Sequence, residues 1–343
     1  MELSPRKEAV LAAVVRAYLQ TGEPIGSKTL AAMLEHAPSS ATLRNEMNAL
    51  CALGLLCQPH TSAGRIPTGS GYRLYINSLM KPGDLTQSTR DFIDAGLTAN
   101  EADPERLLLR AGQVLSDLTG LPAFSYYESE ETVTVKRVQW VPIGGRSVML
   151  VAVFSDGRTK SRLCRIPDGF SAEHGERLSA LVKQRVIRRS AEELNKAYLQ
   201  NVIASAGFDS LMLMPLLTQL FEMAAEMISF PIFWSNSAAL YRICGEEGTQ
   251  RLMMLSHRGE PFKRLFSSLQ QGTDILLGSE SGYPQLQDCC MIVSDCQTNR
   301  KTCGKIGVVG SCRMPYEQIV PSIEYTAQRL SKLLTEAQKN MED

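Results

Sequence analysis

The first 80 residues carry apolar positions at the spacing of three short amphipathic helices. Ser4 and Pro5 are expected to start the first helix, because a capping hydroxyl precedes a proline at the first helical position. Its buried face is formed by Val10, Leu11, Val14, Val15 and Tyr18. Ser27 is expected to cap the second helix, whose apolar positions are Leu30, Ala31 and Leu34.

The third predicted helix follows Pro38, with Ser39 or Ser40 as its cap. One face is an apolar stripe at helical spacing, made of Leu43, Met47 and Leu50. The other face is short and polar and holds one cation: Ser40, Thr42, Arg44, Asn45 and Asn48. Hydroxyls, amides and a guanidinium on the first turns of a helix are the groups that base edges and phosphates require.

A hairpin with a basic tip is expected after this helix. Gly54 ends the helix, Leu55 and Leu56 begin a strand, and residues 58–65 form a turn-rich loop that ends in Arg65. Three helices and a hairpin within about 80 residues are typical of a winged helix-turn-helix. A capped amphipathic helix before a Gly/Pro loop is also common in proteins that bind no nucleic acid. The pattern alone therefore leaves both interpretations open.

Three segments between Thr21 and Asn77 are far more restrictive than any general helix-turn-helix pattern. They read TGEPIGSKTL, SSATLRNEMNALCALGLL and QPHTSAGRIPTGSGYRLYIN. Together they closely resemble the N-terminal domain of the HrcA family, which are bacterial heat-inducible transcription repressors. The late segments DILLGSE and GKIGVVGSCRMPYEQIV resemble the same family, whereas residues 168–245 follow it only loosely.

The resemblance implies a function. It implies a homodimeric repressor that binds the inverted-repeat CIRCE operator of chaperone operons, is released on heat stress, and is re-activated by a GroEL-type chaperonin. We expect base or phosphate contacts from Arg44, Asn45 and Asn48, with Glu46 orienting Arg44. The remaining expected DNA-binding residues are Ser40 and Thr42 at the start of the helix, and His60, Thr61 and Arg65 on the wing.

The pattern changes twice in the rest of the chain. Residues 86–118 have helical spacing, after a linker-like Lys81-Pro82-Gly83-Asp84. From Thr132 the period becomes two, and Ser147 to Phe154 is a nearly continuous apolar run, so an antiparallel sheet is expected. Strand patterns return late, over 273–277, 291–293 and 305–309, before a terminal helix from about 319.

The helical region between these strands has two notable features, and each of them allows two interpretations. Residues 211–228 are the most apolar helical stretch, which suits a core helix or a dimer seam. A basic cluster, formed by Lys183, Arg185, Arg188 and Arg189, suits a solvated helix face better than a nucleic-acid contact.

The expected fold class is α+β and multidomain. The winged helix-turn-helix spans 1–80, and a GAF-like antiparallel-sheet domain with a linker helix begins at 81–167 and resumes at 246–343. A mainly helical dimerisation domain is inserted at 168–245. The GAF-like character and the dimerising role are implied by the family resemblance. Helices between two groups of strands indicate an insertion by themselves.

Composition adds little specificity but excludes several classes of protein. The 343 residues are 44% hydrophobic with a formal net charge of zero, and residues 1–80 hold seven Lys/Arg against five acids, which is a weak positive bias. Nine scattered cysteines without a C-x-x-C favour reduced thiols in a cytoplasm and argue against zinc. We expect no signal peptide, no membrane span, no metal and no cofactor.

No enzyme motif is convincing. Ser279 lacks the two-glycine elbow of a hydrolase, and Cys289 and Cys290 have no identifiable histidine partner. A non-enzymatic repressor is therefore the first hypothesis. The alternative is a transcription regulator whose GAF-like domain binds a small-molecule effector, although the sequence offers no convergent set of polar residues for one.

Overall fold

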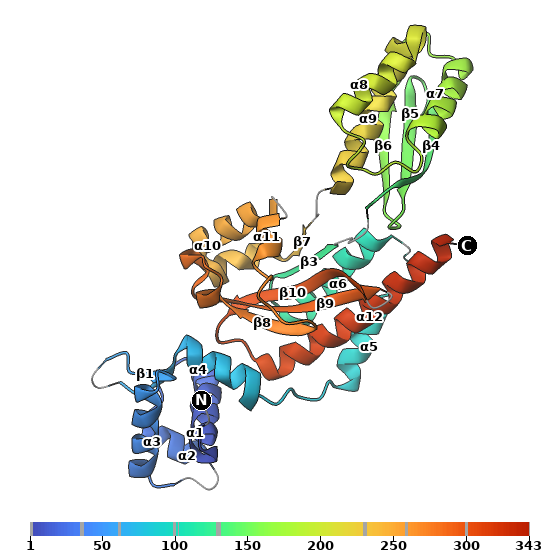
Figure 1. Ribbon diagram of the computed structural model, residues 1–343. Helices are drawn as coiled ribbons and strands as arrows, with labels where there is room; N and C mark the ends of the chain where they lie inside the picture. Colours follow the sequence, from blue (N-terminus) through green and yellow to red (C-terminus); the bar gives the residue numbers. More distant parts are fainter. Residues whose placement is uncertain are drawn as a thin grey trace.

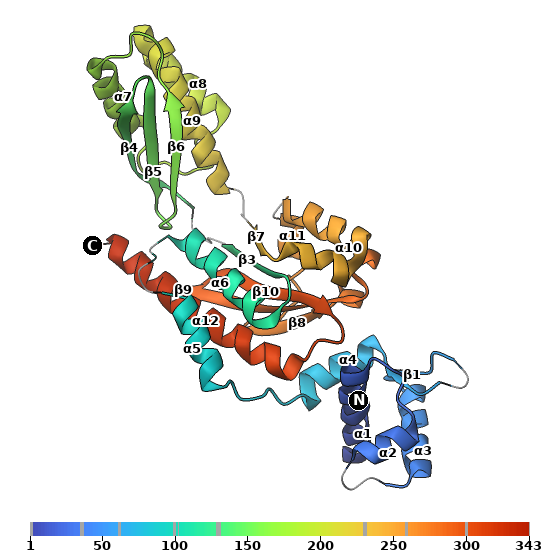
Figure 2. The same cartoon turned by 180° about the vertical axis from the view of Figure 1, so that it is seen from behind.

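The computed structural model describes residues 3–34, 38–60, 63–98, 101, 103–127, 132–228, 232–257, 260–298 and 301–342. They form three units in a row: an N-terminal head (residues 3–79), a central unit (84–127 and 232–342) and an insertion (132–228) (Figure 1). The head and the insertion lie at opposite ends of the molecule, and the reverse view agrees (Figure 2). The protein is α+β and multidomain, as expected.

The head is a winged helix-turn-helix. Its elements are α1 Pro5–Thr21, α2 Ser27–Met33, α3 Ser40–Ala52, β1 Leu56–Cys57, β2 Ile66–Pro67, α4 Gly69–Leu74 and a π-helical turn Tyr75–Leu79. The Ser4 side chain caps α1 by accepting from the Lys7 N–H, so this expectation is confirmed. The expectation for Ser27 is wrong, because Gly26 takes the N-cap position of α2 and no side chain caps it.

The central unit is built on one antiparallel sheet of five strands in the order β7-β3-β10-β9-β8. The strands are β3 Ala123–Tyr127, β7 Ile232–Ser235, β8 Thr273–Leu277, β9 Cys289–Thr298 and β10 Lys301–Ser311. Short 3-10 turns lie at Ser237–Ala239, Gly278–Glu280 and Pro284–Leu286. The region 86–118 holds two helices, α5 Gln87–Gly96 and α6 Pro104–Thr119, with a break between them.

Helices cover both faces of this sheet (Figure 1). On one face, α6 and the terminal helix α12 Tyr316–Glu342 pack in one hydrophobic cluster with alternate strand residues such as Ile292 and Ile306. On the other face, α10 Leu240–His257 and α11 Glu260–Arg264 pack over Met291 and Val293. Strands of such a sheet are buried on both sides, and this explains why β9 is almost continuously buried.

The insertion has its own sheet and its own core. Strands β4 Val135–Gly144, β5 Ser147–Phe154 and β6 Thr159–Arg165 form a three-stranded antiparallel sheet in that order. The helices α7 Ala172–Arg185, α8 Lys196–Ser205 and α9 Ser210–Ile228, with a 3-10 turn at Gly207–Asp209, complete the unit. The inward side chains of β5, from Val148 to Phe154, are buried against α7 and α9 in a separate hydrophobic cluster.

The assignment of the strands over 132–166 to the GAF-like sheet is wrong. Among the described residues, these strands form a sheet only with one another, because the apolar face of β5 is covered by α7 and α9 and not by the central helices. The central sheet is instead completed by β3 and β7, which pair from Ala123–Ser235 to Tyr126–Ile232. The chain therefore leaves the central sheet after Tyr127 and returns to it at Ile232.

The stretch Gly207–Ile228 is long and apolar enough to cross a membrane by length and composition, although no such stretch was expected from the sequence. Eight of the 19 residues of α9 are buried in the cluster of the insertion. A core helix of a water-soluble unit meets the same length and composition criteria.

Candidate nucleic-acid interface

Helix α3 presents a polar face to solvent. Its apolar stripe, Leu43, Met47 and Leu50, is buried in the head. Arg44, Asn45 and Asn48, which occupy the opposite face, are exposed. The helix starts where Ser39 turns from extended to helical backbone and its hydroxyl accepts from the Thr42 N–H at 3.1 Å. Periodicity and the cap together therefore fix which side chains face outward.

A hollow of about 440 Å³ lies between the start of α2, the exposed face of α3 and the wing. The wing is the hairpin of β1 and β2 with its loop. The residues that line the hollow are Ile25, Gly26, Ser27, Arg44, Met47, Asn48, Gln58, Ala63, Gly64 and Arg65. Three segments that are distant along the chain thus converge on one polar surface.

Arg65 joins the wing to α3. Its guanidinium donates from Nη2 to Asn48 Oδ1 at 2.8 Å and from Nη1 to the Ala63 carbonyl at 3.4 Å. The Gln58 side-chain amide donates to the same Ala63 carbonyl at 3.0 Å. Because its oxygen accepts from Arg65, the Asn48 amide is held with its NH2 group available to an acceptor outside the protein.

The wing approaches the α1–α2 turn so closely that one position admits only glycine. Arg65 and Ile25 exchange two backbone hydrogen bonds, of 2.9 and 2.8 Å. A Cβ on Gly64 would lie 2.4 Å from the Ile25 carbonyl carbon and 2.6 Å from the Pro24 oxygen. This close backbone contact places Arg65 at the hollow and holds the wing against the α1–α2 turn.

Glu46 differs from the expectation, whereas Ser40 and Thr42 lie at the start of α3 as expected. Glu46, expected to orient Arg44, instead forms an ion pair with Lys7 of α1, with Nζ and Oε2 3.6 Å apart. The Thr42 hydroxyl lies 2.9 Å from the Ser39 hydroxyl and so takes part in the cap. Ser40 is the first residue of α3 and is half-buried.

The loop of the wing is described only in part. His60 is exposed on this loop, and Thr61 lies outside the described residues. Sequence reasoning missed Gln58 and the start of α2 at Gly26 and Ser27, which line the hollow. The sequence did contain a signal for these three residues, because they lie in the segments that carry the family resemblance, TGEPIGSKTL and QPHTSAGRIPTGSGYRLYIN.

The two cysteines considered as possible nucleophiles lie in the central unit and not in the head. Cys289 and Cys290 are buried in the central sheet. Burial raises the pKa of the Cys290 thiol, and the hydrogen bond with Cys244 together with burial raises the pKa of the Cys289 thiol. Both thiols therefore keep their protons at neutral pH, and a protonated buried thiol is a poor nucleophile. Within the described part of the chain, no three His, Cys, Asp or Glu residues gather as a metal site would require.

Comparisons with known proteins give matches along nearly the whole chain. Residues 2–79 match the family model described as "Winged helix-turn-helix transcription repressor, HrcA DNA-binding", and residues 105–320 match "HrcA protein C terminal domain". The heat-inducible transcription repressor HrcA of Moorella thermoacetica is 29% identical, over 97% of this chain and 98% of its own. That of Bartonella quintana is 31% identical, over 97% and 96%.

A solved structure has the same fold. It is a crystal structure described as that of a hypothetical protein, and it aligns with a TM-score of 0.72 over 98% of this chain and 100% of its own, at 22% identity. The similarity therefore covers all three units.

Proposed function

Because the chain belongs to the HrcA family of heat-inducible transcription repressors, with a winged-helix DNA-binding head, we propose that it represses chaperone operons in the cytoplasm as a homodimer. Each head of the dimer binds one half of a CIRCE-type inverted repeat. Two-fold symmetry of the protein then matches two-fold symmetry of the operator.

The observation that carries this proposal is the exposed polar face of α3 next to the wing. Arg44, Asn45 and Asn48 project, exposed, from the first turns of this helix beside the wing. A helix of this kind fits the major groove of B-DNA, where an arginine pairs with guanine and an asparagine with adenine. His60, Thr61 and Arg65 follow on the wing, where contacts to the sugar-phosphate backbone are expected.

Support for the homodimer comes from the insertion. One face of its sheet is packed on helices, and the other is open in Figure 2. Val141, Met149 and Leu163 lie side by side across the three strands on this open face. Val141 is 47% and Leu163 65% exposed, which is unusual for a row of large apolar side chains. We propose that a second copy covers this face. The alternative seam on α9 has less support, because eight of its 19 residues are buried in the core of the insertion.

The first experiment is footprinting of the purified full chain on a duplex that carries the CIRCE inverted repeat, with and without GroEL-type chaperonin. Two protected half-sites related by the dyad are expected, with protection that extends to lower protein concentration when chaperonin is present. A protein that protects neither half-site under both conditions contradicts the proposed function. Protection that falls steeply with added salt is also expected, because phosphate contacts release counterions.

The heat response follows in this proposal from limited stability and needs no dedicated sensor. Separate cores in one chain of this length favour partly folded states that associate before they refold. Protein that is heated and cooled alone should recover little operator binding, and chaperonin with ATP should restore it. Gel-shift titration before and after the heat step measures this, and full unaided recovery contradicts the idea.

A further inference from the structure

The head does not hang freely from the central unit but packs against it along a seam. The seam is where α4 and the π turn of the head meet α12, β8 and the turn after β8 (Figure 1). Tyr72 and Tyr75 of the head share a hydrophobic cluster with Tyr316 and Ile319 of α12. This shared cluster contrasts with the insertion, whose core is its own.

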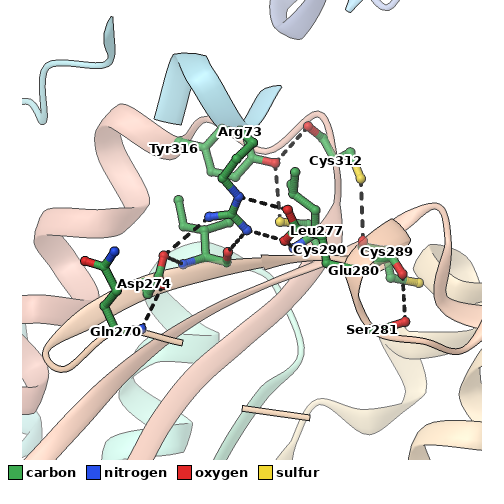
Figure 3. Close-up of polar contacts among 12 residues, drawn as sticks. Arg73, Gln270, Asp274, Leu277, Glu280, Ser281, Cys289, Cys290, Cys312 and Tyr316 are labelled. Carbon is green, nitrogen blue, oxygen red and sulfur yellow. Dashed lines mark hydrogen bonds and ion pairs between the residues drawn. The ribbon is translucent and has the colours of Figure 1, made fainter. Parts of the chain in front are cut away.

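Arg73 of α4 crosses the seam (Figure 3). Its guanidinium binds Glu280 through two hydrogen bonds, one of them from Nε to Oε1 at 2.9 Å. It also donates from Nη2 to the Ile275 carbonyl at 2.6 Å, and its Nη1 lies 3.5 Å from Asp274 Oδ1. One side chain of the head thus holds two carboxylates and one carbonyl of the central unit.

The acceptors of Arg73 are also held by hydrogen bonds within the central unit. Glu280 accepts from the Leu277 N–H at 3.2 Å, and Asp274 accepts from the N–H groups of Gln270 at 3.0 Å and of Ile275 at 2.7 Å. The hydrogen bond to Glu280 is the main cause that raises the pKa of Arg73. A planar, forked donor on a pre-formed set of acceptors defines an orientation, which a flexible lysine ammonium does not.

A second polar contact lies on the same seam. Glu317 of α12 accepts from the Tyr75 hydroxyl at 2.8 Å and from Arg16 Nε at 3.1 Å. Burial raises the pKa of Tyr75 to about 12, so the hydroxyl keeps the proton that it donates. The covalent connection adds a weaker constraint. Residues 80–86 form neither helix nor strand, and the Gly83 N–H ties them to α12 by donating to the Glu317 carbonyl at 2.8 Å.

We propose that Arg73 is a positioning residue that sets which separation of half-sites the repressor accepts. It does so by holding each head at one angle to the central unit, so that the two recognition helices of the dimer keep one distance and one rotation. This inference rests on the proposed binding of an inverted repeat by a homodimer. It adds that spacing selectivity resides in the seam and not in the surface that touches DNA.

The geometry of DNA makes the effect measurable. Each base pair added between half-sites moves the second site by about 3.4 Å and turns it by about 34°. Heads clamped at the seam cannot follow such a rotation without breaking their contacts. Heads released from the Arg73 contacts can follow it by bending residues 80–86 and breaking the Gly83 hydrogen bond to α12. Loss of Arg73 should therefore flatten the dependence of affinity on spacing and leave the affinity of one head for one half-site nearly unchanged.

The experiment compares full-length variants on CIRCE duplexes whose spacer is changed one base pair at a time up to about half a helical turn. A duplex with a single half-site is measured alongside. In Arg73→Ala the ratio of affinities for the native and altered spacings should fall by about tenfold. Glu280→Gln, a milder change across the same contact, should lower the ratio in the same direction. Arg73→Lys should restore it only in part.

Arg329→Ala is the matched control. Arg329 pairs with Asp94 at 3.1 Å, and these side chains are 33% and 42% exposed, close to the 25% and 37% of Arg73 and Glu280. That pair joins α12 to α5 inside the central unit, so its loss should leave the spacing profile unchanged.

The outcomes separate the inference from the proposed function. Wild-type protein that does not bind the native CIRCE duplex refutes the function itself. Wild-type binding with a spacing profile that neither Arg73→Ala nor Glu280→Gln changes overturns the inference alone. Equal losses on single and double half-sites overturn it too, because they would mean that the head and not its angle was damaged.

Discussion

Two arginines of the candidate interface lie in different surroundings. Arg65 is half-buried and is held by Asn48 and the Ala63 carbonyl. Arg44 is exposed and forms no hydrogen bond or ion pair with another described residue. A guanidinium without internal partners has all five of its donors available to DNA, whereas Arg65 has already committed some of its own.

Arg44 is therefore expected to read a base. Arg44→Ala should cost about 1–3 kcal/mol of discrimination between operator and unrelated DNA. Arg44→Lys should lose the same discrimination while it keeps most of the salt dependence, because an ammonium still neutralises a phosphate. Gel-shift titrations on both duplexes at several salt concentrations measure the two effects. Unchanged operator preference in Arg44→Ala would show that Arg44 does not read the sequence.

Helical periodicity was sufficient to predict which residues of α3 face outward, since it depends on the local sequence alone. The contact between Arg65 and Asn48 was not predictable, because it joins residues 17 positions apart that meet only when the wing packs on the α1–α2 turn. The pairing of Glu46 with Lys7 was missed for the same reason, since it depends on how α1 crosses α3. Tertiary packing decides such contacts, and spacing along one helix does not contain it.

At the scale of elements, the two serines at the start of α3 are expected to have different roles. Ser39 stabilises the helix, and Ser40 is proposed to contact DNA. Ser39 Oγ accepts from the Thr42 N–H and lies 2.9 Å from the Thr42 hydroxyl, and Ser40 is the first helical residue. Ser39→Ala should lower the free energy of unfolding by about 1 kcal/mol, because an N–H of the first turn loses its acceptor.

Ser40→Ala is the matched control for that change. It removes the same hydroxyl one position later and should leave the urea midpoint of the full chain nearly unchanged, while it lowers operator affinity if Ser40 touches a phosphate as proposed. Urea unfolding followed by circular dichroism measures stability, and gel shifts measure affinity. A larger loss of stability in Ser40→Ala than in Ser39→Ala would contradict the assignment of the cap.

The bounds of the strands were easier to predict from the sequence than their pairing into sheets. The apolar runs of β5 and β8 predicted their bounds correctly, because an apolar strand is a local pattern. The sheet to which β5 belongs was predicted wrongly, since an apolar run shows that a strand is buried but not what buries it. The short edge strand β7, with four residues, carried too little pattern to be detected.

At the scale of the whole molecule, the insertion also has a fixed joint with the central unit. Glu105 at the start of α6 receives Lys160 Nζ at 2.9 Å and lies 3.8 Å from Arg158 Nη1. Arg158 is buried and bonds Asp156 at 2.6 Å and the Met227 carbonyl at 3.1 Å. With the seam at the other end, the central unit connects the proposed dimer contact to the DNA-binding head through two polar joints.

The pairing of β4, β5 and β6 with one another bears on the bounds of the insertion. We propose that the insertion spans residues 132–228, so that it begins before the three-stranded sheet.

The open sheet face of the insertion provides the last prediction. Leu163 is 65% exposed in the row with Val141 and Met149, and Leu211 of α9 is 73% exposed outside the sheet. Leu163→Asp should weaken the dimer by about 2 kcal/mol or more, roughly thirtyfold in Kd, because it places a charge inside an apolar contact. Leu211→Asp, an equal change in chemistry on the same unit, should leave the dimer intact.

Sedimentation equilibrium measures the dimer, and gel shifts on single and double half-sites measure the consequence. Leu163→Asp should bind a single half-site as the wild type does and lose the gain in affinity that the second half-site brings, because the two heads no longer share one molecule. If Leu163→Asp stayed dimeric while Leu211→Asp dissociated, the dimer contact would lie on α9 and the open sheet face would have another partner. A dimer unaffected by either change would place the contact outside the insertion.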